Sequence, residues 1–213
     1  MPIAREGLPL IGLSLGFAIL LFVIGIPVLP VICVLFFLFC LFFFRNPKRM
    51  PFNVDDPFIS PADGRVIDIG NVEEKEYIHG RVKRICIFMS PLDVHVNRAP
   101  CDGKILAVQH RKGEFALAYK KDIDKENEKN YILIDKDGEK ILLVQIAGFL
   151  ARRITAYVKE GDLVKKGDPV GIIAFGSRVD IYFPEHYQSV VKSGMKVKAG
   201  VTSLAKTMKE ENI

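Results

Sequence analysis

The chain has 213 residues, with 30 Lys and Arg against 25 Asp and Glu, which gives a formal net charge of +5. This length suits one ordinary domain plus an appendage. Because basic and acidic residues are interspersed, the charge predicts no nucleic-acid-binding stripe and is more typical of a surface that meets anionic lipid. The mean hydropathy of +0.21 is high for a soluble protein, and one local segment causes it.

That segment lies near the N-terminus. Residues 8–44 contain no charged side chain, a stretch too long for a single span of about 20 residues. Gly25 and Pro27 interrupt it, and proline breaks helices, so we expect two short helices at about 8–24 and 28–44. The alternative, a cleaved signal peptide, would have an apolar region of only about 7–15 residues.

The flanks of this predicted hairpin are both basic. Arg5 precedes it, and the run Arg-Asn-Pro-Lys-Arg at 45–49 follows it. The positive-inside rule therefore predicts that both ends lie on the cytoplasmic side of the cell membrane. We expect a membrane anchor over residues 1–45 and a cytoplasmic domain over residues 46–213. The four cysteines have no metal-ligand spacing and suit reduced, buried thiols.

The rest of the chain has the pattern of short β-strands. The predicted strands cover 65–72, 82–89, 104–110, 131–134, 140–147 and 154–158. Asp-Lys-Asp-Gly at 135–138 predicts a hairpin turn between two of them. Such closely spaced strands indicate a mainly β domain, either a sandwich or a barrel.

A short internal repeat refines this prediction. Residues 158–167 and 191–200 both have the form V-K-x-G-x-x-V-K-x-G, which is the tight-turn pattern of biotinyl- and lipoyl-like β-sandwich hybrids. Two copies indicate a pseudo-symmetric β-core. The expected fold is thus a barrel-sandwich-hybrid-like domain with an N-terminal two-helix hairpin.

Gly176 and Ser177 lie between the two copies and form a candidate reactive site. A serine hydroxyl becomes a nucleophile only when it is activated, and glycine tolerates strained backbone angles and leaves its carbonyl open to attack. An ordinary turn is the alternative for any single Gly-Ser pair. A second candidate segment, 90–100, has alternating residues that put His95 and Asn97 on one face.

Several separated motifs together resemble the phosphatidylserine decarboxylase family, in particular its short bacterial and archaeal branch. The resemblance covers nearly the whole chain. The segments that carry it are 43–47, 60–65, 90–100, 127–128, 146–153 and 175–178.

The resemblance implies an enzyme that is made as an inactive proenzyme. Ser177 would attack the carbonyl carbon of Gly176, and β-elimination of the resulting ester would break the chain. Residue 177 would become a pyruvoyl group with loss of ammonia, and the large chain 1–176 and small chain 177–213 would stay associated. The pyruvoyl carbonyl would condense with the amine of a phosphatidylserine and accept the electrons left by carbon dioxide. No metal or nucleic acid is expected, and the partners are a phospholipid and the membrane.

The resemblance also implies roles for individual side chains. His95 matches a histidine that handles substrate, and a histidine suits proton transfer near pH 7. Asp63 matches an aspartate that assists self-cleavage, as a base or as the residue that orients one. Three arginines are candidates to hold the lipid phosphate, because a guanidinium donates in a fork; they are Arg152, Arg153 and Arg178.

The chain departs from the pattern of the longer family members at one informative position. Those members have a second histidine three residues after the first, where this chain has Arg98. Either His95 therefore serves both steps, or Asp63 acts without a histidine relay. His186 is a reserve candidate for a second histidine.

Three other functions are alternatives to weigh against the sequence. An archaetidylserine decarboxylase would share the head-group motifs and differ in the lipid tails. A non-enzymatic, lipoyl-like membrane adaptor would need a modifiable lysine at a hairpin tip, and Met195-Lys196 matches that requirement only in part. A membrane-anchored metallopeptidase would need a His-x-His pair, which the sequence lacks.

Overall fold

The computed structural model describes residues 2–51, 53, 55–113, 127–148, 153–174 and 176–207. The chain forms two compact units, Met1–Lys48 and Arg49–Ile213.

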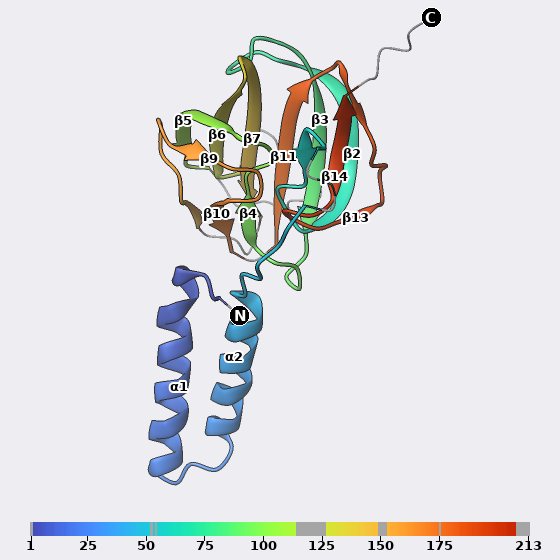
Figure 1. The fold of residues 1–213 in the computed structure, drawn as a ribbon. Coiled ribbons are helices and arrows are strands. Elements are labelled where there is room, and N and C mark those ends of the chain that lie inside the picture. The colour runs from blue at the N-terminus through green and yellow to red at the C-terminus, as the bar shows by residue number, and fades with distance from the viewer. Residues whose placement is uncertain are drawn as a thin grey trace, which may run out of the picture. The chain divides into compact units, whose positions relative to one another are not determined.

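The N-terminal unit is a pair of apolar helices. A short 3₁₀ turn (η1, Arg5–Gly7) leads into α1 (Leu8–Val23), and a bend at Gly25 (φ +79°) leads to α2 (Leu29–Phe43) (Figure 1). The two helices agree with the predicted positions. Most of their apolar side chains are exposed, as expected for helices that face lipid rather than a protein core. The helical run Arg5–Val23 is 19 residues long and apolar enough to cross a membrane, whereas α2 is shorter.

In the second unit, the regular secondary structure of the described residues is all strand. Their bounds are β1 (Phe58–Ile59), β2 (Gly64–Glu74), β3 (Gly80–Met89), β4 (Val96–Arg98), β5 (Gly103–Arg111), β6 (Lys129–Lys136), β7 (Glu139–Ala147), β8 (Ile154–Ala156), β9 (Leu163–Val164), β10 (Pro169–Ile173), β11 (Ser177–Pro184), β12 (Tyr187–Ser189), β13 (Lys196–Val197) and β14 (Ser203–Thr207). Every strand predicted from the sequence overlaps one of these.

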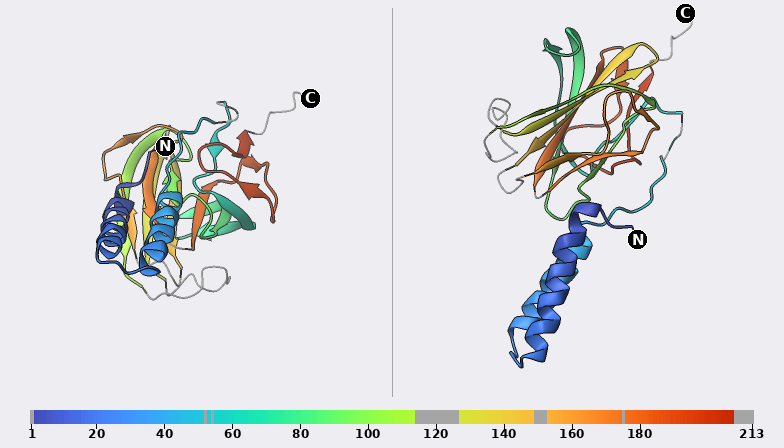
Figure 2. Two further views of the ribbon diagram at one scale, coloured as in Figure 1. Left: turned by 90° about the horizontal axis from the view of Figure 1, so that it is seen from below. Right: turned by 90° about the vertical axis from the view of Figure 1, so that its left-hand side faces the viewer.

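One large curled sheet forms the frame of this unit (Figures 1 and 2). Its eight strands follow the order β13-β2-β3-β11-β7-β6-β5-β9, and two three-stranded sheets, β1-β14-β12 and β4-β10-β8, complete the unit. The main core gathers side chains from all three sheets, including Phe58 of β1, Val170 of β10 and Val179 of β11. The fold is therefore mainly β and sandwich-like, which confirms the predicted class.

The strand order has an internal two-fold symmetry. In the large sheet, β13-β2-β3-β11 reads as the mirror of β9-β5-β6-β7. Irregularities in register occur at matching places, between Val66 and Asp68 in β2 and between Ile105 and Ala107 in β5. The two copies of the V-K-x-G repeat contain β9 and β13, which form the opposite edges of the sheet. The predicted pseudo-symmetric core is confirmed.

The two halves are not consecutive in sequence. One half is continuous and comprises β4 to β10, and it is inserted between β3 and β11 of the other half. In the inserted half, the strands β6 and β7 form the predicted hairpin, with the two-residue turn Asp137-Gly138 at φ +53° and +87°. In the other half, the corresponding strand ends are Met89 and Ser177, which pair with each other although the segment 90–176 separates them in sequence. Ser177 thus lies where a hairpin turn would otherwise be.

Candidate active site

Ser177 is the first residue of β11, in the middle of the large sheet. It pairs with Met89 of β3 on one side and with Ala147 of β7 on the other. Its side chain is fully buried, and its hydroxyl donates to the thioether sulfur of Met89 at 3.5 Å. Because a thioether is a weak acceptor, the hydroxyl is held in position without being strongly engaged.

Gly176 has the backbone conformation that its sequence context predicts. Its φ is +61°, in the left-handed region that favours glycine. Its chain neighbours aside, a Cβ atom at this position would meet no atom of the described residues within 4 Å.

His95 lies directly before β4 and is fully buried. Its carbonyl oxygen accepts a hydrogen bond from the backbone nitrogen of Ile173 at 3.4 Å. Ile173 ends β10, four residues before Ser177 along the chain. Among the residues with described positions, no hydrogen bond joins the His95 imidazole to the Ser177 hydroxyl.

Asp63 precedes β2 and is engaged on both oxygens. Arg49 donates to both oxygens in a fork, with Nη2–Oδ2 at 2.8 Å, and the backbone nitrogen of Ala199 donates to Oδ1 at 2.8 Å. The other half repeats part of this arrangement, because Asp102 Oδ1 accepts from the backbone nitrogen of Lys166 at 2.6 Å. Asp63 therefore anchors the turn at Ala199, in the second copy of the V-K-x-G repeat, as Asp102 anchors the turn at Lys166 in the first. Asp102 is exposed, and among the described residues no arginine pairs with it.

Arg98, which takes the place of the second histidine expected from the resemblance to longer family members, is largely buried near this ion pair. Its Nη1 donates to the carbonyl oxygen of Gly167 at 2.7 Å, and its backbone nitrogen donates to the carbonyl of Pro61 at 2.9 Å. Burial lowers the pKa of Arg98, and the positive charge of Arg49 lowers it further. The backbone contact ties β4, which directly follows His95, to the segment that contains Asp63.

Three buried amides form a hydrogen-bonded chain that leads to the same sulfur. Asn130 Nδ2 donates to Gln145 Oε1 at 2.9 Å, and Gln145 Nε2 donates to Asn97 Oδ1 at 2.7 Å. Asn97 Nδ2 then donates to Met89 Sδ at 3.5 Å. The alternation of residues 90–100 predicts Asn97 on the same face as His95, but Gln145 and Asn130 were not predicted, because three amides far apart in sequence form no motif.

The three arginines differ in their suitability as phosphate ligands. Arg178 is 3% exposed and pairs with Asp180 through Nε–Oδ1 at 2.6 Å. As the neighbour of Ser177 in a strand, its side chain points to the opposite face of the sheet. Arg153 is exposed directly before β8, and Arg152 lies outside the described residues.

His186, the reserve candidate, lies elsewhere. Its Nε2 is 3.2 Å from Oε1 of Glu139, and Glu139 begins β7. Ala147, at the other end of β7, is the residue that pairs with Ser177. Eight residues of extended strand span about 27 Å, so His186 is remote from Ser177.

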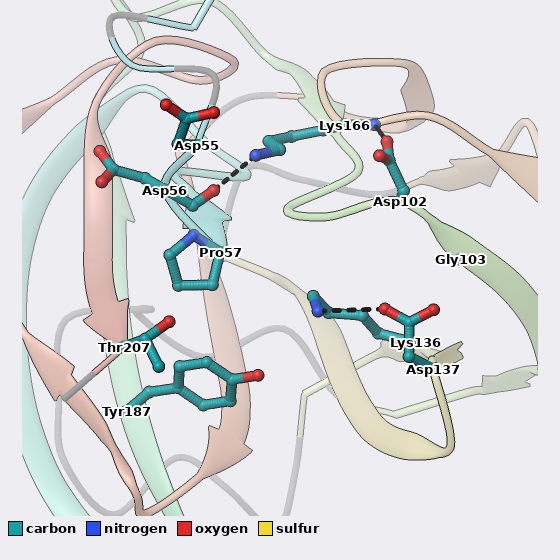
Figure 3. Close-up of a pocket in the computed structure, with 10 residues that line it drawn as sticks. All are labelled: Asp55, Asp56, Pro57, Asp102, Gly103, Lys136, Asp137, Lys166, Tyr187 and Thr207. Carbon is teal, nitrogen blue, oxygen red and sulfur yellow. Dashed lines mark hydrogen bonds and ion pairs between the residues drawn. The ribbon is translucent and has the colours of Figure 1, made fainter. Parts of the chain in front are cut away.

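A cavity of about 360 Å³ occupies that remote end (Figure 3). It is the two-fold counterpart of the Ser177 region, since Lys136 and Asp102 on its wall correspond to Met89 and Asp63. Lys166 crosses one side and donates from Nζ to the carbonyl of Asp56 at 2.5 Å. Within the described parts of the chain, no group of three His, Cys, Asp or Glu side chains is arranged to hold a metal ion.

Comparison with known proteins identifies close relatives over most of the chain. The family described as phosphatidylserine decarboxylase matches residues 36–205. A phosphatidylserine decarboxylase proenzyme of Carboxydothermus hydrogenoformans is 46% identical over 173 residues, which cover 81% of each chain. One of Desulfotalea psychrophila is 40% identical over 207 residues and 96% of each chain. A putative archaetidylserine decarboxylase proenzyme of Methanothermobacter thermautotrophicus is 43% identical over 180 residues, 79% of this chain and 80% of its own.

Proposed function

The chain belongs to the phosphatidylserine decarboxylase family, and from that premise we propose that it cuts itself between Gly176 and Ser177 and then decarboxylates phosphatidylserine to phosphatidylethanolamine. The observation that carries this proposal is the buried Ser177 hydroxyl, which follows a glycine at φ +61° and, among the described residues, donates to a weak acceptor, the Met89 sulfur. A pyruvoyl group derived from Ser177 would supply the carbonyl that condenses with the substrate amine and accepts electrons from the breaking carboxylate bond.

Proton transfer falls to His95, and Asp63 orients the segment that carries it. Both Asp63 oxygens already accept hydrogen bonds from Arg49 and Ala199, which makes a direct approach to the Ser177 hydroxyl unfavourable. The His95 imidazole is buried at the start of β4, and imidazole exchanges protons near neutral pH. Of the two alternatives for self-cleavage, this favours His95 serving both steps.

The two chains would stay together after cleavage because strand pairing holds the small one. Within it, β11 pairs with β3 and β7, β13 pairs with β2, and β14 pairs with β1. These contacts place the small chain in two of the three sheets. The new N-terminus would therefore remain fixed in the middle of the large sheet.

The apolar hairpin would bring this domain to its lipid substrate. The helical run Arg5–Val23 has the length of a span, and the basic flanks at Arg5 and 45–49 favour a cytoplasmic position for both ends. The exposed Arg153 is the described arginine best suited to meet the lipid phosphate. Arg152 shares this role only as a sequence-based expectation, and the pairing of Arg178 with Asp180 favours a structural role for that residue.

The test compares wild-type protein with Ser177→Ala on denaturing gels and by intact mass. Wild-type protein should give two fragments, the second starting at residue 177 with a keto group in place of its amine, and should release carbon dioxide from phosphatidylserine in mixed micelles. Ser177→Ala should stay uncut and inactive. Ser189→Ala is a matched control that should behave as wild type, because the Ser189 hydroxyl donates to the carbonyl of Val191 at 3.2 Å, in a strand that does not pair with β11. An uncut, active protein with an intact serine would overturn the proposal.

Serine lipids with ether-linked tails are a second candidate substrate, favoured by the similarity to the archaeal relative. Parallel assays with ester-linked and ether-linked serine lipids in the same micelles separate the two. A preference of tenfold or more in kcat/KM for the ether lipid would assign the chain to the second activity.

A further inference from the structure

The buried amide chain is not required by the fold, because the other half of the domain does without it. Two equivalent backbone hydrogen bonds, from Ile59 N to Pro100 O and from Arg98 N to Pro61 O, show that Ile59 and Arg98 occupy equivalent positions in the two halves. The residues before them, Phe58 and Asn97, are therefore also equivalent. The pairs Met89–Ser177 and Lys136–Glu139 are equivalent in the same way. Phe183 lies six residues after Ser177 and Gln145 six residues after Glu139, so these two residues are equivalent as well.

Phe58 and Phe183 stack with their ring centroids 4.9 Å apart. The same position in the half that contains β4 and β7 holds a 2.7 Å hydrogen bond between Gln145 and Asn97. Buried amides must satisfy every donor and acceptor, which an aromatic pair avoids. Their presence in only one half points to a function in that half.

The chain of amides fixes which way Asn97 points. Gln145 Nε2 donates to Asn97 Oδ1, and this hydrogen bond orients the side-chain amide so that the Asn97 amino group faces Met89 Sδ. Ser177 Oγ lies 3.5 Å from that same sulfur, so Asn97 Nδ2 and Ser177 Oγ are at most about 7 Å apart. A donor that faces a thioether is available to any stronger acceptor that forms nearby.

Strand β10 holds Gln145 in place. Gly171 pairs with Asn97, and a Cβ at Gly171 would lie 2.7 Å from Thr155 O and 2.9 Å from Gln145 Nε2. The backbone of β10 therefore packs directly against the Gln145 amide. Preorganised donors of this kind are effective because they need no rearrangement during the reaction.

We propose that Asn97 Nδ2–H donates to the Gly176 carbonyl oxygen while negative charge develops on it during self-cleavage, with Gln145 and Asn130 as positioning residues. The step rests on the proposed function. The Ser177 hydroxyl oxygen bonds to the Gly176 carbonyl carbon, its proton passes to the departing amide nitrogen, and the carbon–nitrogen bond breaks to leave an ester. No oxidant, reductant or further reactant takes part.

Loss of one such donor lowers a reaction rate by about 10²–10³-fold. The test follows scission of newly translated precursor for wild type, Asn97→Leu and the double variant Asn97→Leu/Gln145→Leu. The double variant removes both partners of the hydrogen bond between Gln145 and Asn97, so neither of these two amides is left unpaired, while Asn130 Nδ2 loses its acceptor on Gln145. Phe58→Leu is the matched control at the symmetric position. Thermal unfolding of each variant in a Ser177→Ala background measures folding without scission.

Hydroxylamine provides the readout that a structural role would not change, because it cleaves esters but not amides. Wild-type precursor should show a transient hydroxylamine-sensitive population. Both Asn97 variants should be folded, should cut at least 100-fold more slowly and should accumulate no such ester, while Phe58→Leu should cut at nearly the wild-type rate.

Three outcomes would overturn this inference. They are wild-type scission rates in the Asn97 variants, slowed scission with accumulation of ester, and equal slowing in Phe58→Leu. If Asn97→Leu gives no cooperative unfolding transition, the double variant decides by the same criteria. Failure of the proposed function would give a different result, because the wild-type precursor itself would then remain uncut.

Discussion

The pair Asp63 and Asp102 offers a test that separates anchoring from chemistry. Each carboxylate accepts a backbone hydrogen bond in equivalent turns, from Ala199 and Lys166. Only Asp63 also forms a forked pair with Arg49, where the two side chains are 11% and 12% exposed. The substitutions Asp63→Asn and Asp102→Asn therefore remove the same charge from two structurally related sites.

The expected stability losses follow from these contacts. A hydrogen bond to a charged group contributes about 1.5–3 kcal/mol, so we expect Asp63→Asn to lose about 2–3 kcal/mol. Asp102 is exposed and its asparagine keeps an acceptor for Lys166, so Asp102→Asn should lose about 1 kcal/mol or less. For a domain of this size each kcal/mol lowers the Tm by about 2–4 °C. Unfolding in a Ser177→Ala background measures both values.

Scission is then compared at a temperature well below both unfolding transitions. Asp63→Asn should slow scission by about 100-fold or more, because general acid–base groups contribute about 10²–10⁴-fold. Loss of the Arg49 pair would loosen the segment that contains Asp63 and Pro61, and the Pro61 carbonyl holds β4 next to His95. Asp102→Asn should cut at the wild-type rate. Equal scission rates in the two variants would refute the reasoning and reduce Asp63 to an anchor.

Three further predictions concern other residues. His95→Gln should abolish decarboxylation and slow scission by about 10²-fold or more, measured by carbon dioxide release and gel; unchanged scission would restrict His95 to the substrate step. Gly171→Ala should cost about 1–3 kcal/mol by overpacking against Gln145 and should slow scission as well, whereas a loss of stability alone would show that the amide position is unimportant. Burial raises the pKa of Cys101 to about 12 and also raises that of Cys86, so neither thiol should react with iodoacetamide at pH 8 unless the protein is unfolded; rapid labelling of the native protein would contradict this.

Local pattern was sufficient for much of the fold. Alternating and apolar runs located β2, β3, β5, β6 and β7, although β11 was not among the predicted ranges. The charge-free segment interrupted at Gly25 and Pro27 located both helices. The V-K-x-G repeat indicated the pseudo-symmetry, because positive φ at Gly161 and Gly194 is a backbone requirement that sequence records directly.

Long-range pairing was beyond the same reasoning. Strands of two or three residues, such as β1 and β9, owe their existence to partners far away in sequence. The insertion of one half into the other was also missed, although Pro-Ala-Asp-Gly-Arg at 61–65 and Pro-Cys-Asp-Gly-Lys at 100–104 record it. The pairing of Arg49 with Asp63 was also not predicted, because it depends on how the intervening residues fold and not on a local sequence pattern.

Ser177 lies at the strand end where the other half of the domain has a hairpin turn, and this location would let the protein tolerate a break in its own chain. Hairpin tips accept insertions and nicks because the flanking strands keep their partners. Here the strand that would carry the new chain end keeps its neighbours on both sides, β3 and β7. Loss of the peptide link would therefore convert an insertion point into a chain terminus while the surrounding ladder stays intact, and a reactive end group would be held as rigidly as any residue inside a strand.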